Sequence, residues 1–417
     1  MKPRKSIVAL LVAGFAAIIG LSFVPYTLTV VSDAGQLVSA TFNASPDAAS
    51  SAANVKVESP PPFDAGAWYA GRGEQLETHG ALVETYEARK VVAAHNPDQL
   101  YNPASLVKLA TSLAVLRKLG VAYRFQTRVY TDGVTDASGT LRGNLHFAGN
   151  DPTFGDATAA RVLDELKKRG IKRVTDGVTV SPDFSFNFNN VPEKSAQNLA
   201  KVLKLGTKKA EAAEQATGAL LFSVESNALP QILLYMNAHS INFVAERLGD
   251  MIGGPGGVTL FLVGELKIPA REVLLESTSG LGHNRMTPRG MIAVLRALVE
   301  EAKRLGLKPE EIMSVASDDA GTLRRRFRDT ELEGAVVAKT GTLTQEVDGG
   351  MTSLAGLVYT QNKGAVLFAF FDQGNRIAEN RGMQDELLRE MVLSQDATRP
   401  LPPAERKLLP RDELIIH

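Results

Sequence analysis

The spacing of apolar residues changes several times along the chain, and each pattern predicts a different element. A helix is expected after Asn102, a suitable cap, with Pro103 in its first turn and Gly120 at its end. Its apolar side chains recur every three or four positions and should form one buried stripe, which comprises Leu106, Leu109, Leu113 and Leu116.

Two short strand-like runs precede this helix and predict a hairpin. Helical periodicity returns later in the chain, and three apolar strand-like runs follow before a final helix. Strands without regular strand–helix alternation predict an antiparallel sheet with helices packed on it. The ranges are 82–87 and 91–95 for the hairpin, 229–251 and 288–305 for the returning helices, 335–340, 352–360 and 365–371 for the later strands, 361–364 for the turn between the last two, and 377–393 for the final helix.

A separate α/β segment is expected between the first helix and the returning helices. Strand-like runs at 128–131, 144–148 and 174–181 surround a helix at 157–169. The end of the segment, 194–216, is rich in Lys, Glu and Ala, and we expect it to be helical or mobile. This segment is therefore interpreted as a small inserted domain.

The N-terminus has the pattern of an export signal. Lys2, Arg4 and Lys5 precede an apolar run over 7–24, which as a helix would reach ~27 Å, against a hydrocarbon core of ~30 Å. A cleaved signal peptide and an uncleaved membrane anchor both fit; a buried helix fits less well, because an Ala-, Ser- and Pro-rich linker follows. The predicted organisation is a signal peptide or anchor at 1–40, a linker at 41–62, a main domain at 63–124 and 223–395, an inserted domain at 125–222 and a C-terminal tail at 396–417.

Composition and charge exclude several function classes. The 46 basic residues equal the 46 acidic ones, which argues against a general nucleic-acid binder, and an apolar fraction of 44% excludes wholesale disorder. The chain has no cysteine, so disulfide scaffolds, cysteine-bound zinc, iron–sulfur clusters and thiol nucleophiles are excluded. The chemistry must therefore use hydroxyls, amines, carboxylates or the six histidines.

Common catalytic motifs are missing from the sequence, which has no H-E-x-x-H, no G-x-x-x-x-G-K-[ST] and no G-x-S-x-G. The glycine cluster at 253–257 contains Pro255 and predicts a loop rather than a phosphate cradle. The histidines are scattered, so each is more simply a structural or surface residue than a ligand. No metal site is expected.

One serine and one lysine share a helix face. Ser105 lies in the first turn of the helix after Asn102, and Lys108 lies one turn on, opposite the leucines. A serine hydroxyl is a weak nucleophile until a base removes its proton, and a lysine can be that base where burial or positive charge lowers its pKa. A single S-x-x-K arises about once by chance in a chain of this length, so the pair needs support.

Support comes from Lys339-Thr340-Gly341-Thr342, which ends a strand-like run. A K-T-G is expected only ~0.1 times by chance. A strand end of this composition offers an edge to an extended peptide, with Gly341 allowing close approach and Lys339 attracting a carboxylate. A plain turn after a strand is the alternative.

The third element, S-x-N, has three candidates. Ser240-Ile241-Asn242 is favoured because it lies in the returning helical region. The others are Ser185-Phe186-Asn187, in the inserted segment, and Tyr235-Met236-Asn237, a tyrosine version.

The ordered motifs S-x-x-K, S-x-N and K-T-G resemble those of active-site serine β-lactamases and penicillin-binding proteins. In detail the chain resembles the low-molecular-mass penicillin-binding proteins of the D-alanyl-D-alanine carboxypeptidase/endopeptidase type, which carry a domain between the first two motifs. The resemblance covers about 63–392; it departs from the family at Ile241, where the family has Asp, and in the shorter insertion. The matching segments are Asn102-Pro103-Ala104-Ser105-Leu106-Val107-Lys108, Gly149-Asn150-Asp151-Pro152-Thr153, Ser279-Gly280-Leu281 with Asn284 and Thr287-Pro288, Gly321-Thr322-Leu323-Arg324-Arg325-Arg326, and Ala338-Lys339-Thr340-Gly341-Thr342-Leu343-Thr344.

The resemblance implies an α/β fold of the α+β type, with a serine β-lactamase/DD-peptidase-like five-stranded antiparallel sheet packed with helices and a small inserted α/β domain. It implies a serine-type D-alanyl-D-alanine carboxypeptidase that acts on peptidoglycan stem peptides through an acyl-enzyme at Ser105. Backbone N–H groups of Ser105 and Thr342 would form the oxyanion hole. The other site residues implied are Lys108, Ser240, Asn242 and Lys339 in catalysis and Thr340, Gly341 and Thr342 in substrate binding.

The resemblance also implies partners and a location. β-Lactams are expected as covalent inhibitors, with no metal or organic cofactor, no nucleic acid, and membrane contact only through an uncleaved N-terminal segment. The expected location is the periplasm or cell envelope. The alternatives are a DD-endopeptidase that cleaves cross-links, a β-lactamase, and a weakly active peptidoglycan-binding relative.

Overall fold

The computed structural model describes residues 27–31, 37–41, 63–317, 319–402 and 409–417. The chain divides into two units, Met1–Pro60 and Pro61–His417. In the first unit β1 (Thr27–Val31) pairs antiparallel with β2 (Leu37–Thr41). The apolar run at 7–24, the candidate signal peptide or anchor, lies outside the described residues. Within the described ranges no helix combines the length and apolar character needed to cross a membrane.

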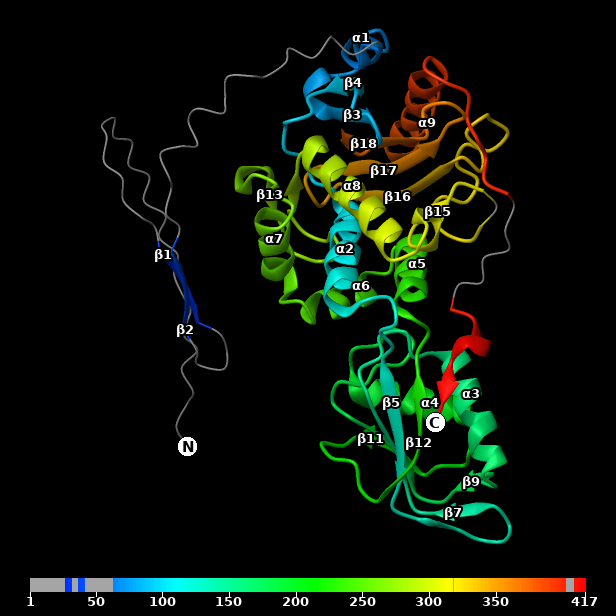
Figure 1. Cartoon of the computed structure of the whole chain (residues 1–417). Helices are drawn as coiled ribbons and strands as arrows, with labels where there is room; N and C mark the ends of the chain where they lie inside the picture. Colours follow the sequence, from blue (N-terminus) through cyan, green and yellow to red (C-terminus); the bar gives the residue numbers. More distant parts are fainter. Residues whose placement is uncertain (1–26, 32–36, 42–62, 318, 403–408) are drawn as a thin grey trace. The chain divides into compact units, whose positions relative to one another are not determined.

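An antiparallel sheet of six strands lies in one part of the second unit, the upper part in Figure 1. All the predicted strands outside the inserted segment join it. The expected number of five is wrong by one, because a two-residue edge strand is too short to leave a periodic signal. The strand order is β15 (Ser314–Val315), β16 (Val336–Leu343), β17 (Met351–Tyr359), β18 (Ala365–Gln373), β3 (His79–Thr85) and β4 (Val91–His95).

Both faces of this sheet are buried, and alternate side chains of β18 point into two different apolar cores. Leu367, Ala369 and Phe371 belong to one apolar core, while Val366, Phe368 and Phe370 belong to another on the opposite face. A central strand covered on both sides reads as a continuous apolar run, as this one does in the sequence. The turn at 361–364 closes the β17–β18 hairpin with Gly364 at a φ of 68°.

Two groups of helices cover the two faces (Figure 1). The first core contains residues of α2, α5, α6, α7 and α8, and the second contains residues of α1 and α9. The final helix occupies the predicted range, 377–393. The helices are α1 (Ala65–Ala70), α2 (Val107–Leu119), α5 (Leu229–His239), α6 (Asn242–Asp250), α7 (Gly254–Gly264), α8 (Pro288–Arg304) and α9 (Ile377–Leu393).

Helix α2 departs from the expected single apolar stripe. Every side chain from Val107 to Leu116 is buried, including Lys108, Thr111 and Ser112. These polar groups have partners: Thr111 donates to the Thr278 carbonyl at 2.8 Å, and Ser112 donates to the Lys108 carbonyl at 2.7 Å. A polar residue on such a helix therefore marks an internal contact rather than a solvent-facing side.

Two other expectations in the main domain are wrong. The glycine cluster at 253–257 opens helix α7 instead of forming a loop, with Gly253 in the left-handed region at a φ of 95°. The helical range 229–251 is two helices, because Ser240 takes a left-handed conformation that ends α5.

The inserted segment forms most of a second sheet, which has its own apolar core. The range 194–216 continues from α4 into a strand, so it is not wholly helical. The C-terminal residues, expected to be a tail, supply the edge strand β19. The order is β11 (Lys209–Ala212), β10 (Gly177–Val180), β8 (Leu145–Ala148), β5 (Gln126–Thr131), β12 (Ala219–Glu225) and β19 (Ile415–Ile416), with helices α3 (Asp156–Lys168) and α4 (Pro192–Leu203).

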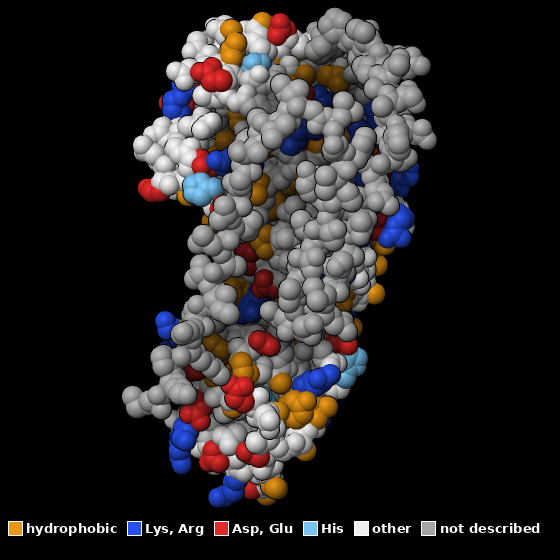
Figure 2. Space-filling model, turned by 90° about the vertical axis from the view of Figure 1, so that its left-hand side faces the viewer, with side chains coloured by type: hydrophobic (Ala, Val, Ile, Leu, Met, Phe, Trp, Pro, Cys, Tyr) orange, Lys and Arg blue, Asp and Glu red, His pale blue; other side chains and the backbone are white. Residues whose placement is uncertain are grey.

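Short elements complete the described residues. They are β6 (Val134–Thr135), β7 (Thr140–Arg142), β9 (Arg173–Val174), β13 (Val273–Leu274), β14 (Arg285–Met286) and the 3₁₀ helices η3 (Leu76–Thr78), η4 (Ala104–Leu106), η5 (Ala270–Glu272), η6 (Pro309–Glu311) and η7 (Arg411–Glu413). Basic and acidic side chains are interspersed at the lower end of the view in Figure 2, where the second sheet lies. This mixture agrees with the zero net charge of the chain.

Candidate active site

Ser105 lies on a tight 3₁₀ turn, η4, at the start of α2. The residue before it, Ala104, has a φ of 49°, a left-handed conformation that costs a non-glycine residue about 1 kcal/mol or more. The Asn102 side chain accepts a hydrogen bond from the Ala104 N–H at 3.0 Å, so it caps this turn rather than the α-helix itself. The turn leaves the Ser105 side chain partly exposed although its neighbours are buried.

Lys108 is held at the centre of the site by three hydrogen bonds. Its Nζ donates to Ser105 Oγ at 3.1 Å, to Asn242 Oδ1 at 2.7 Å and to the Ser279 carbonyl at 2.5 Å. Burial lowers the pKa of Lys108 to about 7, although the carboxylate of Glu246 opposes this effect. At neutral pH a large fraction of the amine is therefore unprotonated and within reach of the serine proton.

Lys339 forms a second buried amine. Its Nζ donates to Ser240 Oγ at 2.9 Å and to the Thr340 carbonyl at 2.5 Å. Burial lowers the pKa of Lys339 well below its ordinary value, and the positive charge of Lys108 lowers it further. The S-x-N motif is thus linked to both of the others: Lys108, which binds Ser105, also binds Asn242, and Lys339 binds Ser240.

The break between α5 and α6 explains how Ser240 and Asn242 both reach a lysine. Ser240 has a φ of 55° and ends α5, while Asn242 is the first residue of α6. Two residues that would point apart on one continuous helix are thereby brought to the same side. The favoured S-x-N assignment agrees with this geometry.

The two other S-x-N candidates have structural partners. Ser185 donates to the Asp151 carbonyl at 3.3 Å, and Asn187 Oδ1 accepts from the Asp156 N–H. Asn237 donates to Ser112 and to the Ile312 carbonyl, both at 3.0 Å. Neither candidate is joined to Ser105 or Lys339 by these contacts.

The K-T-G segment forms part of β16 beside the nucleophile turn. A Cβ on Gly341 would lie 2.2 Å from Ser353 Oγ and 2.9 Å from the Pro103 carbonyl oxygen, so only glycine allows this approach. Strand β15 pairs with β16 only at Val337 and Ala338. Within the described part of the chain, the rest of that β16 edge, including Thr340 and Thr342, has no neighbouring strand.

Several site residues were not identified from the sequence. Glu246 accepts hydrogen bonds from the N–H groups of Ser279, at 3.0 Å, and Thr278, at 3.3 Å, and thereby fixes the carbonyl that binds Lys108. The spacing of Glu246, four residues after Asn242, was an available signal, since both lie on one helix face. Arg381 of α9 donates to Thr342 Oγ1 at 3.0 Å and had no signal near any motif.

A salt-bridged network joins the loops around the site. Asp348 accepts from Arg285 Nη1 at 2.7 Å, from Asn102 Nδ2 at 2.6 Å and from His283 Nδ1 at 2.9 Å. Burial raises the pKa of Asp348, but these hydrogen bonds outweigh burial and hold the pKa well below its usual value. Asp348 therefore connects the nucleophile turn, the Ser-Gly-Leu loop and the loop after β16.

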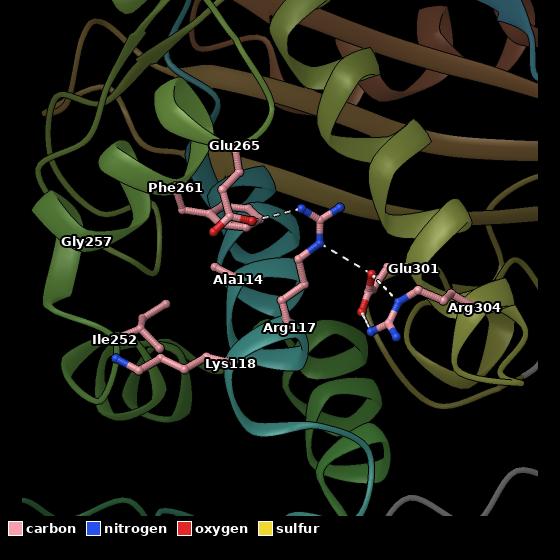
Figure 3. Close-up of a pocket in the computed structure, with 9 residues that line it drawn as sticks. All are labelled: Ala114, Arg117, Lys118, Ile252, Gly257, Phe261, Glu265, Glu301 and Arg304. Carbon is pink, nitrogen blue, oxygen red and sulfur yellow. Dashed lines mark hydrogen bonds and ion pairs between the residues drawn. The ribbon is translucent and has the colours of Figure 1, made fainter. Parts of the chain in front are cut away.

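A pocket of about 640 Å³ lies at the other end of α2, between α7 and α8 (Figure 3). Four of its ionic groups pair with one another: Arg117 bonds Glu265 at 3.1 Å and Glu301 at 3.3 Å, and Arg304 bonds Glu301 at 2.5 Å. Lys118 also lines the pocket. The hydrogen bonds from Arg304 are the main reason that the pKa of Glu301 is lowered. The ion pairs of Arg117, Arg304, Glu265 and Glu301 join α2, the end of α7 and α8. In the described ranges no group of three or more His, Asp or Glu residues is arranged to hold a metal ion.

Comparisons with known proteins agree with this arrangement. The model of the D-Ala-D-Ala carboxypeptidase 3 (S13) family matches residues 70–191 and 183–391. The fold is similar to that of Bd3459, a predatory peptidoglycan endopeptidase from Bdellovibrio bacteriovorus. The comparison with the complex of Bd3459 and its immunity protein Bd3460 gives 19% identity and a TM-score of 0.68, over 79% of this chain and 96% of the other.

Two further solved structures extend the comparison. Bd0816, a predatory endopeptidase from the same organism, has 19% identity and a TM-score of 0.68 over 81% of this chain and 99% of the other. Penicillin-binding protein 4 from Haemophilus influenzae has 20% identity and a TM-score of 0.58 over 75% of this chain and 96% of the other. Because the family model spans most of the sequence, the chain belongs to the D-Ala-D-Ala carboxypeptidase 3 (S13) family of low-molecular-mass penicillin-binding proteins.

Proposed function

We propose that this protein is a serine-type D-alanyl-D-alanine carboxypeptidase that hydrolyses peptidoglycan stem peptides through an acyl-enzyme at Ser105. The observation that carries the proposal is the contact of 3.1 Å between Ser105 Oγ and Lys108 Nζ, together with the burial that lowers the pKa of Lys108 to about 7. A base with a pKa near the working pH combines availability with proton affinity.

The proposed first step is attack by Ser105 Oγ on the carbonyl carbon of the penultimate D-Ala, as Lys108 takes the serine proton. The N–H groups of Ser105 and Thr342 would stabilise the oxyanion. The bond from the carbonyl carbon to the nitrogen of the terminal D-Ala then breaks, and that amine receives a proton through Ser240, assisted by Asn242 and Lys339. Water completes the reaction by attacking the ester, which releases the shortened peptide and restores Ser105.

The proposed assignment of the nucleophile is tested by covalent labelling. The purified protein and its Ser105→Ala variant are incubated with a fluorescent penicillin and separated under denaturing conditions. We expect a labelled band only for the wild-type protein; equal labelling of both would contradict the assignment. A short-lived adduct with hydrolysis of the antibiotic would indicate a β-lactamase, and a stable adduct without peptide cleavage would indicate a weakly active relative.

A DD-endopeptidase is the second candidate, supported by the similarity of the fold to Bd3459 and Bd0816, which are both endopeptidases. The same residues would cleave the D-Ala–diaminopimelate bond of a cross-link. Mass spectrometry of digested muropeptides separates the two activities: loss of one D-Ala indicates a carboxypeptidase, and conversion of dimers to monomers indicates an endopeptidase.

The proposed location is the periplasm or cell envelope, where peptidoglycan lies. The basic residues at positions 2, 4 and 5 and the apolar run at 7–24 support export. Fractionation of cells, with and without the first 40 residues, tests this location and whether the segment is cleaved.

A further inference from the structure

The inserted domain carries a basic groove that no catalytic motif includes. Lys201, Lys204, Lys208 and Lys209 line a groove of about 500 Å³ between the end of α4 and the edge strand β11, both labelled in Figure 1. No residue that lines this groove is acidic. Four positive charges therefore meet on one small surface of a chain whose net charge is zero, and we call this surface the lysine groove.

Two of the lysines lie on the solvent side of α4 at its end. Lys201 and Lys204 are exposed and three residues apart, while Leu199 and Leu203 belong to the apolar core of the second sheet. Lys204 takes a left-handed conformation at a φ of 51°, and Gly206 follows at 79°, so the chain turns back toward the sheet. Cations suit this position because they offset the negative end of the helix dipole.

The other two lysines lie where the edge strand begins, beyond the reach of that dipole. The N–H groups of Lys208 and Lys209 donate to the Asp176 carbonyl at 2.8 and 3.1 Å, beside β10. In the part of the chain that the structure describes, β11 has no strand on its other side. Lysines on an edge discourage pairing with another sheet, and here they also form a positively charged wall of the groove.

The four ammonium groups have no partners of opposite charge. Among the described residues no carboxylate forms an ion pair with any of them, whereas Lys168 of α3 pairs with Glu165 at 3.6 Å. Glu211, two residues after Lys209, is exposed but does not line the groove. Like charges that are not compensated repel one another, so an anion that binds among them gains the attraction of all four.

The lining of the groove favours a polar polymer over a lipid surface. Besides the lysines it offers the hydrogen-bonding side chains of Gln197 and Thr207, and its apolar side chains are those of Ala200 and Ala210. A surface that binds a bilayer needs larger apolar side chains that enter the boundary of the acyl chains. Lysine is a flexible point charge, without the fixed fork of arginine, and so suits carboxylates along a mobile polymer.

We propose that the lysine groove binds carboxylates of uncross-linked stem peptides and thereby holds the protein on peptidoglycan. This inference rests on the proposed function, which brings the protein to that polymer, and deepens it by giving the inserted domain a role in polymer binding. The groove lies on elements that carry none of the three catalytic motifs. One stem peptide can therefore occupy the groove while Ser105 reacts with another.

The inference is tested by sedimentation with insoluble peptidoglycan. The Ser105→Ala protein, which leaves the polymer uncut, is compared with the same protein carrying Lys201→Gln, Lys204→Gln, Lys208→Gln and Lys209→Gln. We expect the four changes to weaken binding by about tenfold at about 50 mM salt, and by less at about 300 mM, where the charges are screened. Peptidoglycan whose carboxylates have been converted to amides should bind both proteins equally weakly.

A matched control removes the same total charge from the main domain. Lys118→Gln, Lys267→Gln, Lys303→Gln and Lys308→Gln change four exposed lysines outside the groove and should leave sedimentation unchanged. Thermal unfolding shows whether each variant is folded. In the protein that keeps Ser105, the four groove changes should leave kcat/KM unchanged for a short soluble peptide ending in D-Ala-D-Ala and should slow the cleavage of insoluble peptidoglycan.

The outcomes separate this inference from the proposed function. Equal sedimentation with and without the groove changes would overturn the lysine groove alone. An equal loss in the control variant would do the same, because binding would then depend on net charge only, and so would undiminished binding to the amidated polymer. Binding that depends on the groove lysines to phosphatidylglycerol vesicles but not to peptidoglycan would also overturn it, since the partner would be a lipid. Groove-dependent sedimentation without cleavage of any peptide by the protein that keeps Ser105 would support the groove and overturn the proposed function.

Discussion

The low pKa of Lys108 predicts a specific pH dependence for acylation of Ser105. With a pKa of about 7, roughly a tenth of the amine is neutral at pH 6 and roughly nine-tenths at pH 8. An ordinary lysine would be less than about one per cent neutral throughout this range. If the neutral amine is the base, the rate constant of acylation should rise about ninefold between pH 6 and pH 8, with its midpoint near 7.

Two substitutions should move this midpoint in opposite directions. Glu246 raises the pKa of Lys108, so Glu246→Gln should lower the midpoint. Asn242 Oδ1 lies 2.7 Å from Lys108 Nζ, so Asn242→Asp places a negative charge against the amine. That charge stabilises the protonated form and should raise the midpoint by about one to three pH units, which slows acylation at pH 7 by about fivefold to about 500-fold.

The assay is the second-order rate constant for reaction with a fluorescent penicillin between pH 5.5 and 9, at constant ionic strength. Labelling at long times shows that each variant still folds and reacts. A rate that is flat between pH 6 and pH 8 would refute the role of Lys108 as a base of low pKa. So would midpoints that move the same way in both variants, because the two changes have opposite electrostatic signs.

Three further outcomes are expected. Gly341→Ala forces β16 away from Ser353 and Pro103, so thermal unfolding should show a loss of about 1–3 kcal/mol and penicillin labelling should slow. Asp348→Asn breaks the network around the site and should cost about 1–3 kcal/mol in denaturant unfolding. The pKa of Asp348 is lowered in the folded state, so its contribution to the free energy of unfolding is present above pH ~4 and is lost as the pH falls below that. The difference in unfolding free energy between the variant and the wild type should therefore become smaller in acid. Removal of residues 409–417 takes away β19, and hydrogen exchange should show faster exchange at Ser223, whose N–H donates to the His417 carbonyl at 3.1 Å.

Local patterns were enough to predict the final helix and the strands of the main sheet that are longer than two residues. The final helix has its predicted range, and the β17–β18 hairpin has its predicted turn, because the signal for each lies within a few residues. The pairing of β12 with β19 joins Val224 to Ile416. No local pattern indicates a partner so distant in the chain. The second sheet was therefore predicted without its C-terminal edge.

The sequence was enough to identify the catalytic motifs of the candidate site, because their residue types and spacing are characteristic. Ser105, Lys108 and Lys339 were found as motifs, and the structure links Lys108 to Ser105 and Lys339 to Ser240. The left-handed conformations of Ala104 and Ser240 were not predictable, because both residue types ordinarily avoid that region. These two positions aim the nucleophile and the S-x-N segment. They are held by packing from distant segments. At Gly280, for example, an added Cβ would lie 1.9 Å from the Ala104 carbonyl oxygen, so the two backbones are in close contact.

The left-handed turn at Ser240 accommodates Ile in the middle of the S-x-N motif, where the family has Asp. Ser240 and Asn242 both face lysines, and Ile241, between them, is partly buried and packs against the apolar core that contains α2 and α8. The middle residue therefore makes its contacts with the core, while its two neighbours contact the lysines. An apolar residue there strengthens the packing that holds the turn, while an aspartate would need a polar partner of its own. The geometry of the motif thus depends on the conformation of Ser240, and the chemistry depends on the two residues that contact the lysines.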